Sequence, residues 1–228
     1  MYSFEKIINE PVHGRKFYTE NQIELLQKKL IDINNTLNLD NQNQKEIINT
    51  VLEYVKENVG YRKTYFDCFT GKVENFDNTN LKYRTAYGAL IEGEAMCAGY
   101  AEAIRVILNS YNINSYTLLS KLPLDSKRLM HYVVAVKNDI ESEKYVILDP
   151  ESEQYCLKKG YNYEDYIEKS IYFLPDKVFT DDVVGKDGAG MLAEEYIKYT
   201  DIPRVIGTKN IHNLIKNPKS KIYKYNNV

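Results

Sequence analysis

The period of the hydrophobic pattern changes along this chain of 228 residues, near Asn112. Before that point, apolar residues recur every three to four positions, as they do on one face of an amphipathic helix. After it the period is two, in segments rich in Val, Ile, Tyr and Thr, which is typical of strands. A helix-rich first half followed by a strand-rich second half predicts an α+β fold.

Three helices are expected in the first half. Thr19 with Gln22 matches a capping box, and Asn41 with Gln44 repeats this pattern before a second apolar stripe. A third helix opens near Cys97 and is predicted to be the central buried helix. The polar residues expected to point away from its apolar face are Glu102, Arg105 and Asn109.

Three strands are expected in the second half, over residues 114–120, 130–137 and 143–149. Further along, the pattern indicates one helix over residues 163–173 and another over 191–199. The predicted organisation has three parts. These are an N-terminal helical extension (1–40), a core (41–160), and a C-terminal extension (161–228) that packs on the core and ends in a loose basic tail.

Composition excludes several classes of function. Thirty Lys and Arg against 32 Asp and Glu give a net charge of −2, so no global field attracts nucleic acid or an anionic membrane. No apolar run of about 18 residues is present to span a bilayer. The N-terminus lacks a signal sequence, which predicts a cytoplasmic protein, or a secreted one if a signal peptide has been removed. Three scattered Cys and three His give no zinc spacing, so no metal or other cofactor is expected.

Cys97 is the first candidate for chemistry, because it lies at the predicted start of the central helix. Unsatisfied backbone N–H groups and the helix dipole favour a thiolate there, and the same groups can donate to an oxyanion. A buried structural cysteine is the alternative interpretation.

His131 and Asp149 lie on two strands that are expected to pair as an antiparallel hairpin. If the loop is Asp139-Ile140-Glu141, the register places His131 directly opposite Asp149, on one face of the sheet. A carboxylate beside an imidazole fixes its tautomer and stabilises the imidazolium. An ordinary cross-strand ion pair is the alternative.

At these residues the chain resembles the bacterial transglutaminase-like superfamily, which has a papain-like fold. Gly93-Glu94-Ala95-Met96-Cys97-Ala98-Gly99-Tyr100-Ala101 resembles its nucleophile motif. His131 begins a strand, as the family histidine does, and Leu148-Asp149-Pro150 resembles the family's Asp-Pro motif. The resemblance covers about residues 45–155 and implies a papain-like core, in which the Cys-bearing helix packs on an antiparallel sheet.

The resemblance implies a role for each of these residues. Cys97 attacks a carbonyl carbon and forms a thioester, His131 transfers the protons, and Asp149 orients His131. The backbone N–H of Cys97 supplies half of an oxyanion hole, and Tyr87 is the candidate for the other donor. The implied partner is a protein or peptide substrate, and the oligomeric state is left open.

The sequence departs from the family pattern in ways that bear on the reaction. Tyr132-Val133-Val134 follows His131 where the family often has Ala-Trp-Asn, Glu151 replaces the Thr after Asp-Pro, and Trp is absent. Hydrolysis of a peptide or isopeptide amide is therefore favoured over protein cross-linking. Two alternatives stay open: a transglutaminase or deamidase that acts on Gln side chains, and a catalytically silent binding module.

Overall fold

The structure is a computed structural model, and the residues that it describes are 18–61, 82–121, 131–141, 143–173 and 204–216. These residues form two compact units, each held together by its own internal contacts, and the chain passes from the first to the second between Tyr116 and Thr117. The first unit is mainly helical and the second contains a five-stranded sheet. The expected α+β class is thus confirmed.

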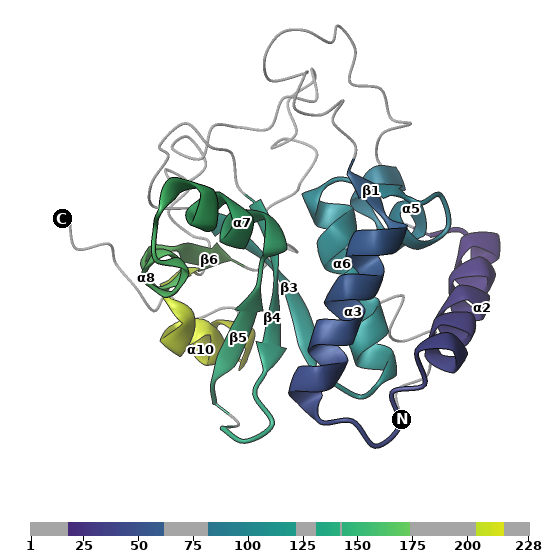
Figure 1. Ribbon diagram of the computed structural model, residues 1–228, viewed down its shortest axis with the longest axis horizontal. Helices are drawn as coiled ribbons and strands as arrows, with labels where there is room; N and C mark the ends of the chain where they lie inside the picture. Colours follow the sequence, from purple (N-terminus) through teal and green to yellow (C-terminus); the bar gives the residue numbers. More distant parts are fainter. Residues whose placement is uncertain (1–17, 62–81, 122–130, 142, 174–203, 217–228) are drawn as a thin grey trace, which may run out of the picture. The chain divides into compact units, whose positions relative to one another are not determined.

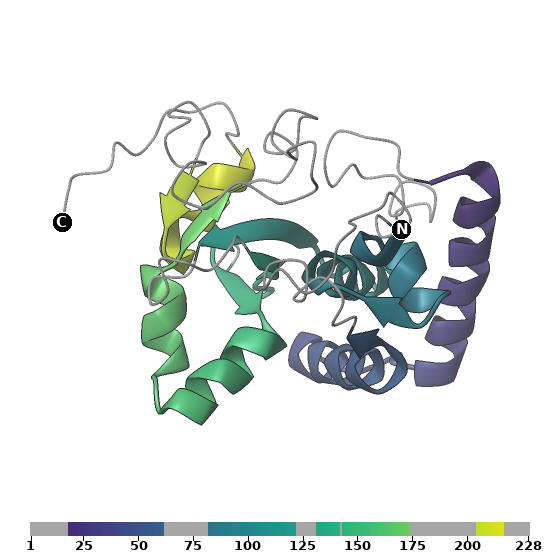
Figure 2. The same cartoon turned by 90° about the horizontal axis from the view of Figure 1, so that it is seen from above.

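The first unit is a helical cluster around one central helix. Helices α2, α3 and α5 all pack against α6, and Figures 1 and 2 show α2 and α3 beside it. The short strands β1 and β2 pair in parallel. The elements are α2 (Glu20–Leu37), α3 (Gln44–Asn58), β1 (Gly60–Tyr61), α5 (Ala86–Leu90), β2 (Glu94–Ala95) and α6 (Cys97–Ser110).

The capping boxes at the starts of α2 and α3 test the local predictions. The box of Thr19 with Gln22 is present as expected. The second box is formed by Asn43 with Glu46, so the prediction of Asn41 with Gln44 was wrong by two residues. Asn41 has a φ of 72°, a left-handed conformation, whereas an N-cap residue needs an extended backbone.

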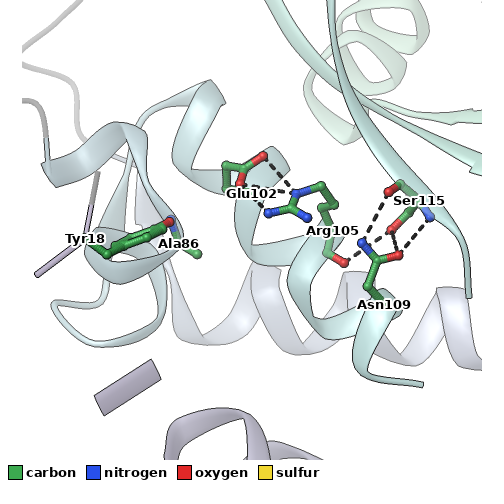
Figure 3. Close-up of polar contacts among 6 residues, drawn as sticks. All are labelled: Tyr18, Ala86, Glu102, Arg105, Asn109 and Ser115. Carbon is green, nitrogen blue, oxygen red and sulfur yellow. Dashed lines mark hydrogen bonds and ion pairs between the residues drawn. The ribbon is translucent and has the colours of Figure 1, made fainter. Parts of the chain in front are cut away.

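The prediction that the polar residues of α6 face solvent was wrong. Glu102, Arg105 and Asn109 were predicted to point away from the buried face, yet all three are buried. Helices α2, α3 and α5 pack against α6, and every residue from Ala101 to Asn109 is buried, so its middle turns leave no face to solvent. These side chains instead bind polar groups inside the unit, as Figure 3 shows.

The second unit is built on a sheet with the strand order β5-β4-β3-β6-β7. The pairs β4–β5, β3–β6 and β6–β7 are antiparallel. Helix α7 follows β5 directly, and Figure 2 shows α7 and α8 as two green helices that meet at a sharp angle. The elements are β3 (Ser115–Lys121), β4 (His131–Lys137), β5 (Tyr145–Leu148), α7 (Pro150–Lys159), α8 (Tyr163–Lys169), β6 (Ile171–Phe173), β7 (Arg204–Ile206), η3 (Thr208–Asn210) and α10 (Ile211–Lys216).

The register of the β4–β5 hairpin differs from the predicted one. Ala135 pairs with Ile147, and Lys137 pairs with Tyr145, which is a shift of two positions. The last bond of the ladder runs from the backbone N–H of Asn138 to the carbonyl of Lys144, over 3.0 Å. The loop between these two residues is therefore longer than the predicted loop Asp139-Ile140-Glu141. Since side chains alternate between the faces of a strand, a shift of two keeps His131 and Asp149 on the same face.

Beyond residue 160 the single helix predicted over residues 163–173 was wrong. The chain forms α8 and then turns at Ser170 into β6. The run Ile171-Tyr172-Phe173 is buried at every position, as expected for β-branched and aromatic residues in a sheet interior. The helix predicted over residues 191–199 lies outside the described residues.

Candidate active site

The start of α6 is held by backbone contacts on both sides of Cys97. The N–H of Met96 donates to the carbonyl of Tyr83 over 2.8 Å, and strand β2 immediately before it pairs with β1. One turn into the helix, the hydroxyl of Tyr100 donates to the carbonyl of Val59, at the end of α3. Cys97 is a half-buried free thiol at the first position of this anchored helix, as the sequence predicted.

The N-cap residue of α6 does not cap the first N–H groups of the helix. Met96 occupies that position and provides no side-chain hydrogen bond. An α-helix leaves its first four N–H groups without partners inside the helix, and together they carry a partial positive charge. Groups of this kind can donate to a negatively charged oxygen beside Cys97.

Gly99 allows the helix to approach the segment that anchors it. A Cβ atom at this position would lie 2.4 Å from the carbonyl oxygen of Tyr83 and 2.8 Å from the Cβ of Ala95. The same Tyr83 carbonyl accepts the hydrogen bond from Met96. Any side chain at Gly99 must therefore displace either the anchor or the first turn that carries Cys97.

Replacing Gly99 by alanine should lower the free energy of unfolding by about 1–3 kcal/mol, despite the better helix propensity of alanine. The measurement is chemical denaturation of the purified variant. Gly60→Ala is the matched control, since a Cβ there would lie 3.5 Å from the carbonyl oxygen of Gly93, an ordinary contact. Equal stability of the two variants would contradict the close approach at Gly99.

His131 and Asp149 form a direct contact within the second unit. Nε2 of His131 lies 2.8 Å from Oδ1 of Asp149. The side chain of His131 is 15% exposed and that of Asp149 is 3% exposed, so solvent screens this contact far less than one at the surface. The structure therefore brings together two of the residues that the sequence singled out.

The carboxylate of Asp149 has one further hydrogen-bond donor, because Asp149 is also the N-cap of α7. The N–H of Ser152 donates to the same Oδ1 over 3.1 Å, and Pro150 occupies the first helical turn. Burial raises the pKa of Asp149. The charge of His131 and hydrogen bonds from His131 and Ser152 outweigh that effect, so the pKa falls below its ordinary value. Asp149 is therefore an anion at neutral pH.

Helix α7 and its link to Asp149 were not predicted from the sequence. The signal was present: Asp followed by Pro is a typical N-cap and first helical residue, and Gly160 ends the helix in a left-handed conformation at φ 71°. Ser152, which contacts Asp149 from the first turn of α7, was missed for the same reason.

Tyr87, the remaining predicted site residue, lies half-buried in α5. Its backbone carbonyl accepts the N–H of Ile91 over 2.9 Å and ends that short helix. The role of its hydroxyl as an oxyanion donor stays a prediction. The candidate residues are thus divided between the units: Tyr87 and Cys97 belong to the first, and His131 and Asp149 to the second.

Two kinds of feature are absent from the residues that the structure describes. In that part of the chain, no three His, Cys, Asp or Glu side chains gather as the ligands of a metal ion would. No helix there is both long enough and apolar enough to cross a membrane.

Comparison with known proteins adds a family match. The family model described as "Transglutaminase-like domain" matches residues 28–178. A solved structure described as "Crystal structure of a TGase" aligns with 58% of this chain at 12% sequence identity and a TM-score of 0.48. The alignment covers 33% of that chain, so the present chain spans about a third of its length. No curated protein matches.

Proposed function

Because the chain belongs to the transglutaminase-like domain family, we propose that it is a cysteine-dependent acyl-transfer enzyme. In this proposal Cys97 is the nucleophile, His131 is the general base and acid, and Asp149 orients His131. The contact of 2.8 Å between His131 and Asp149 is the observation that carries the proposal. It supplies the oriented base that a thiol nucleophile requires.

The proposal gives the two nitrogens of the imidazole different roles. Nε2 lies next to Asp149, so Nδ1 is proposed to exchange the proton with Cys97. In the first step the thiol proton moves to Nδ1 while Sγ bonds to the carbonyl carbon of the substrate, whose oxygen becomes negatively charged. The N–H groups at the start of α6 and the Tyr87 hydroxyl are proposed to bind that oxygen.

The second step forms the thioester. The carbon–nitrogen bond breaks, and the imidazolium of His131 gives its proton to the departing amine. Water then attacks the thioester carbonyl while His131 takes one of its protons. Collapse of this intermediate expels the Cys97 sulfur, which regains the proton. The net reaction consumes one amide and one water molecule and yields an amine and a carboxylic acid.

The proposed substrate is a peptide or isopeptide amide of a protein, with water as the acceptor. If an amine replaced water in the second step, the reaction would be transamidation, and hydrolysis of a Gln side chain would be deamidation. Mass analysis of the products with and without an added primary amine separates these reactions. A cleaved amide bond between two parts of the substrate supports hydrolysis, conversion of Gln to Glu in an uncut chain would indicate deamidation, and covalent incorporation of the amine would indicate transamidation.

The pH dependence of Cys97 alkylation by iodoacetamide tests the proposal without a substrate. The protein carries Cys68→Ser to remove one background thiol, and peptide mapping separates Cys97 from Cys156. Rapid alkylation of Cys97 at pH values well below about 8.5, the pKa of a free thiol, is expected. His131→Ala should abolish this reactivity at neutral pH.

Cys156 serves as an internal control in the same sample. It is fully buried, and burial together with the charge of Asp149 raises its pKa, so it should react slowly. If Cys97 reacted as an ordinary thiol whether or not His131 was present, the catalytic proposal would be wrong. A binding module of the same family would then be the better description.

A further inference from the structure

The start of α6 differs from the starts of other helices in how it is held. Helices α2, α3, α5, α7 and α8 each begin after a residue whose side chain accepts an N–H group of the first turn. These residues are Thr19, Asn43, Thr85, Asp149 and Asn162. Such a cap stabilises the helix end, but it occupies one of the free N–H groups. Met96 provides no such bond at the start of α6, so another contact must hold the turn that carries Cys97.

Strand β1, which follows α3, contacts the segment just before Cys97. The N–H of Gly60 donates to the carbonyl of Gly93 over 2.7 Å, and Tyr61 pairs with Ala95. These contacts fix where the chain enters the helix. Neither of them involves a residue of α6 itself, so neither fixes the orientation of its first turn.

Tyr100 joins the first turn itself to the end of α3. Its hydroxyl donates to the carbonyl of Val59, the C-cap residue of α3. Carbonyls at a helix C-terminus lack partners inside the helix and carry a partial negative charge, which favours a donor there. Tyr100 lies three residues after Cys97, so the two side chains are neighbours on the helix surface. Because the hydroxyl donates, it occupies none of the N–H groups beside Cys97.

The ring of Tyr100 is held by the same segment that accepts its hydroxyl. The centroids of the Tyr61 and Tyr100 rings lie 5.9 Å apart, and the ring planes are tilted by 34°. Contact between two aromatic rings at this distance is favourable and restricts the rotation of both side chains. Tyr61 follows Val59 by two residues, so the ring contact and the hydrogen bond act from one short stretch of chain.

We propose that Tyr100 is a positioning residue that takes the place of a helix cap. Its hydroxyl holds the first turn of α6 in one orientation. It thereby fixes Sγ of Cys97 and the N–H groups that the proposed function assigns to the substrate oxygen. Tyr100 acts through the helix and does not itself touch the substrate. The inference rests on the proposed function for its catalytic consequence, whereas the anchoring of the turn is measurable without activity.

The first experiment compares Tyr100→Phe with the wild-type chain by amide hydrogen exchange, followed by NMR. This variant removes the hydroxyl and keeps the ring beside Tyr61. The backbone N–H of residue 100 donates to the carbonyl of Met96 over 3.0 Å and so closes the first turn. Its exchange should become about fivefold faster, the size of one lost hydrogen bond that opposes local opening.

Tyr111→Phe is the matched control on the same helix. Tyr111 is the C-cap of α6, and its hydroxyl donates to the carbonyl of Asn34 in α2 over 3.3 Å. Each variant thus removes one hydroxyl that joins α6 to the backbone of another helix, at opposite ends of α6. Urea denaturation measures the loss of stability in both, which separates a local effect on the first turn from a general one.

The second readout is the pH profile of Cys97 alkylation by iodoacetamide, in the chain that carries Cys68→Ser. Tyr100→Phe should slow the reaction about fivefold at neutral pH and move the profile to higher pH, because a less ordered first turn stabilises the thiolate less. Tyr111→Phe should leave the profile unchanged. Tyr100→4-aminophenylalanine keeps a donor in the same place and should restore most of the rate. Tyr100→4-fluorophenylalanine fills the space of the hydroxyl without a donor, and it replaces Tyr100→Phe if that variant does not fold.

The two readouts separate the positioning role from the proposed function. If exchange at residue 100 is the same in the wild-type chain and Tyr100→Phe, the positioning role is overturned. It is also overturned if Tyr100→Phe leaves the Cys97 profile unchanged, or if Tyr111→Phe alters that profile equally, and the proposed function then stands. If the wild-type Cys97 is unreactive and insensitive to His131→Ala, the proposed function fails. Faster exchange in Tyr100→Phe alone would then still support the anchoring of the first turn.

Discussion

Replacing Asp149 by asparagine should slow amide turnover by about 10⁴-fold, the effect expected when an imidazole loses the carboxylate that orients it. The fold should be kept, because asparagine is as good an N-cap as aspartate and can still accept the N–H of Ser152. The measurement is steady-state turnover of the amide found by product analysis. Alkylation of Cys97 provides a second readout that needs no substrate.

The pH dependence of the free energy of unfolding shows whether Asp149→Asn has removed the charge of the carboxylate. The pKa of Asp149 is depressed in the folded protein, so its ionisation stabilises the fold above the unfolded-state pKa of about 3.9. That contribution is lost as the pH falls through the lower folded pKa. The difference in the free energy of unfolding between wild type and Asp149→Asn should therefore narrow in acid. Turnover by Asp149→Asn within a few-fold of wild type would contradict the role proposed for Asp149.

Replacing Arg105 by alanine should destabilise the first unit by about 3–5 kcal/mol, the cost of removing one partner from a buried ion pair. Arg105 is 3% exposed and Glu102 is 1% exposed, and Nη2 of Arg105 lies 2.9 Å from Oε2 of Glu102 (Figure 3). Without the guanidinium, the carboxylate is left in an interior that water cannot easily enter. The midpoint and slope of urea denaturation measure the loss.

A double variant separates the charge from the packing. Glu102→Leu combined with Arg105→Met removes both charges and keeps most of the volume, so it should recover most of the lost stability. Lys82→Ala breaks the exposed pair between Lys82 and Glu92 and should leave the free energy of unfolding nearly unchanged. If the double variant were as unstable as Arg105→Ala, lost packing rather than the isolated charge would be the cause.

The predictions that succeeded depend on local patterns. The helix beginning at Cys97 follows from its apolar stripe, and it ends at Ser110, close to Asn112, where the hydrophobic period changes. Asn112 itself has a left-handed conformation at φ 62°, which asparagine tolerates just beyond a helix end. The pairing of His131 with Asp149 survived an incorrect register, because the error was an even number of residues. Alternation of side chains, rather than the predicted loop, therefore determined the outcome.

The predictions that failed depend on what surrounds an element. Nothing in the spacing of Glu102 and Arg105 indicates that the middle turns of α6 are buried on every face, so polar residues were assigned to solvent. The break between α8 and β6 at Ser170 was also missed, since the burial of Ile171 depends on strands far away in sequence. The N–H of Ser152 becomes evident as a donor to Asp149 only once Asp149 is seen to be a helix cap.

The position of β3 in the sheet has a consequence for synthesis on the ribosome. Its partner β6 is encoded more than fifty residues later, with Leu119 opposite Phe173. While the nascent chain is shorter than that, one edge of β3 lacks its final neighbour, and an open edge can pair with another chain. The second unit thus cannot complete its sheet co-translationally until β6, and β7 after it, have left the exit tunnel. A chaperone that binds extended segments would have that interval in which to act.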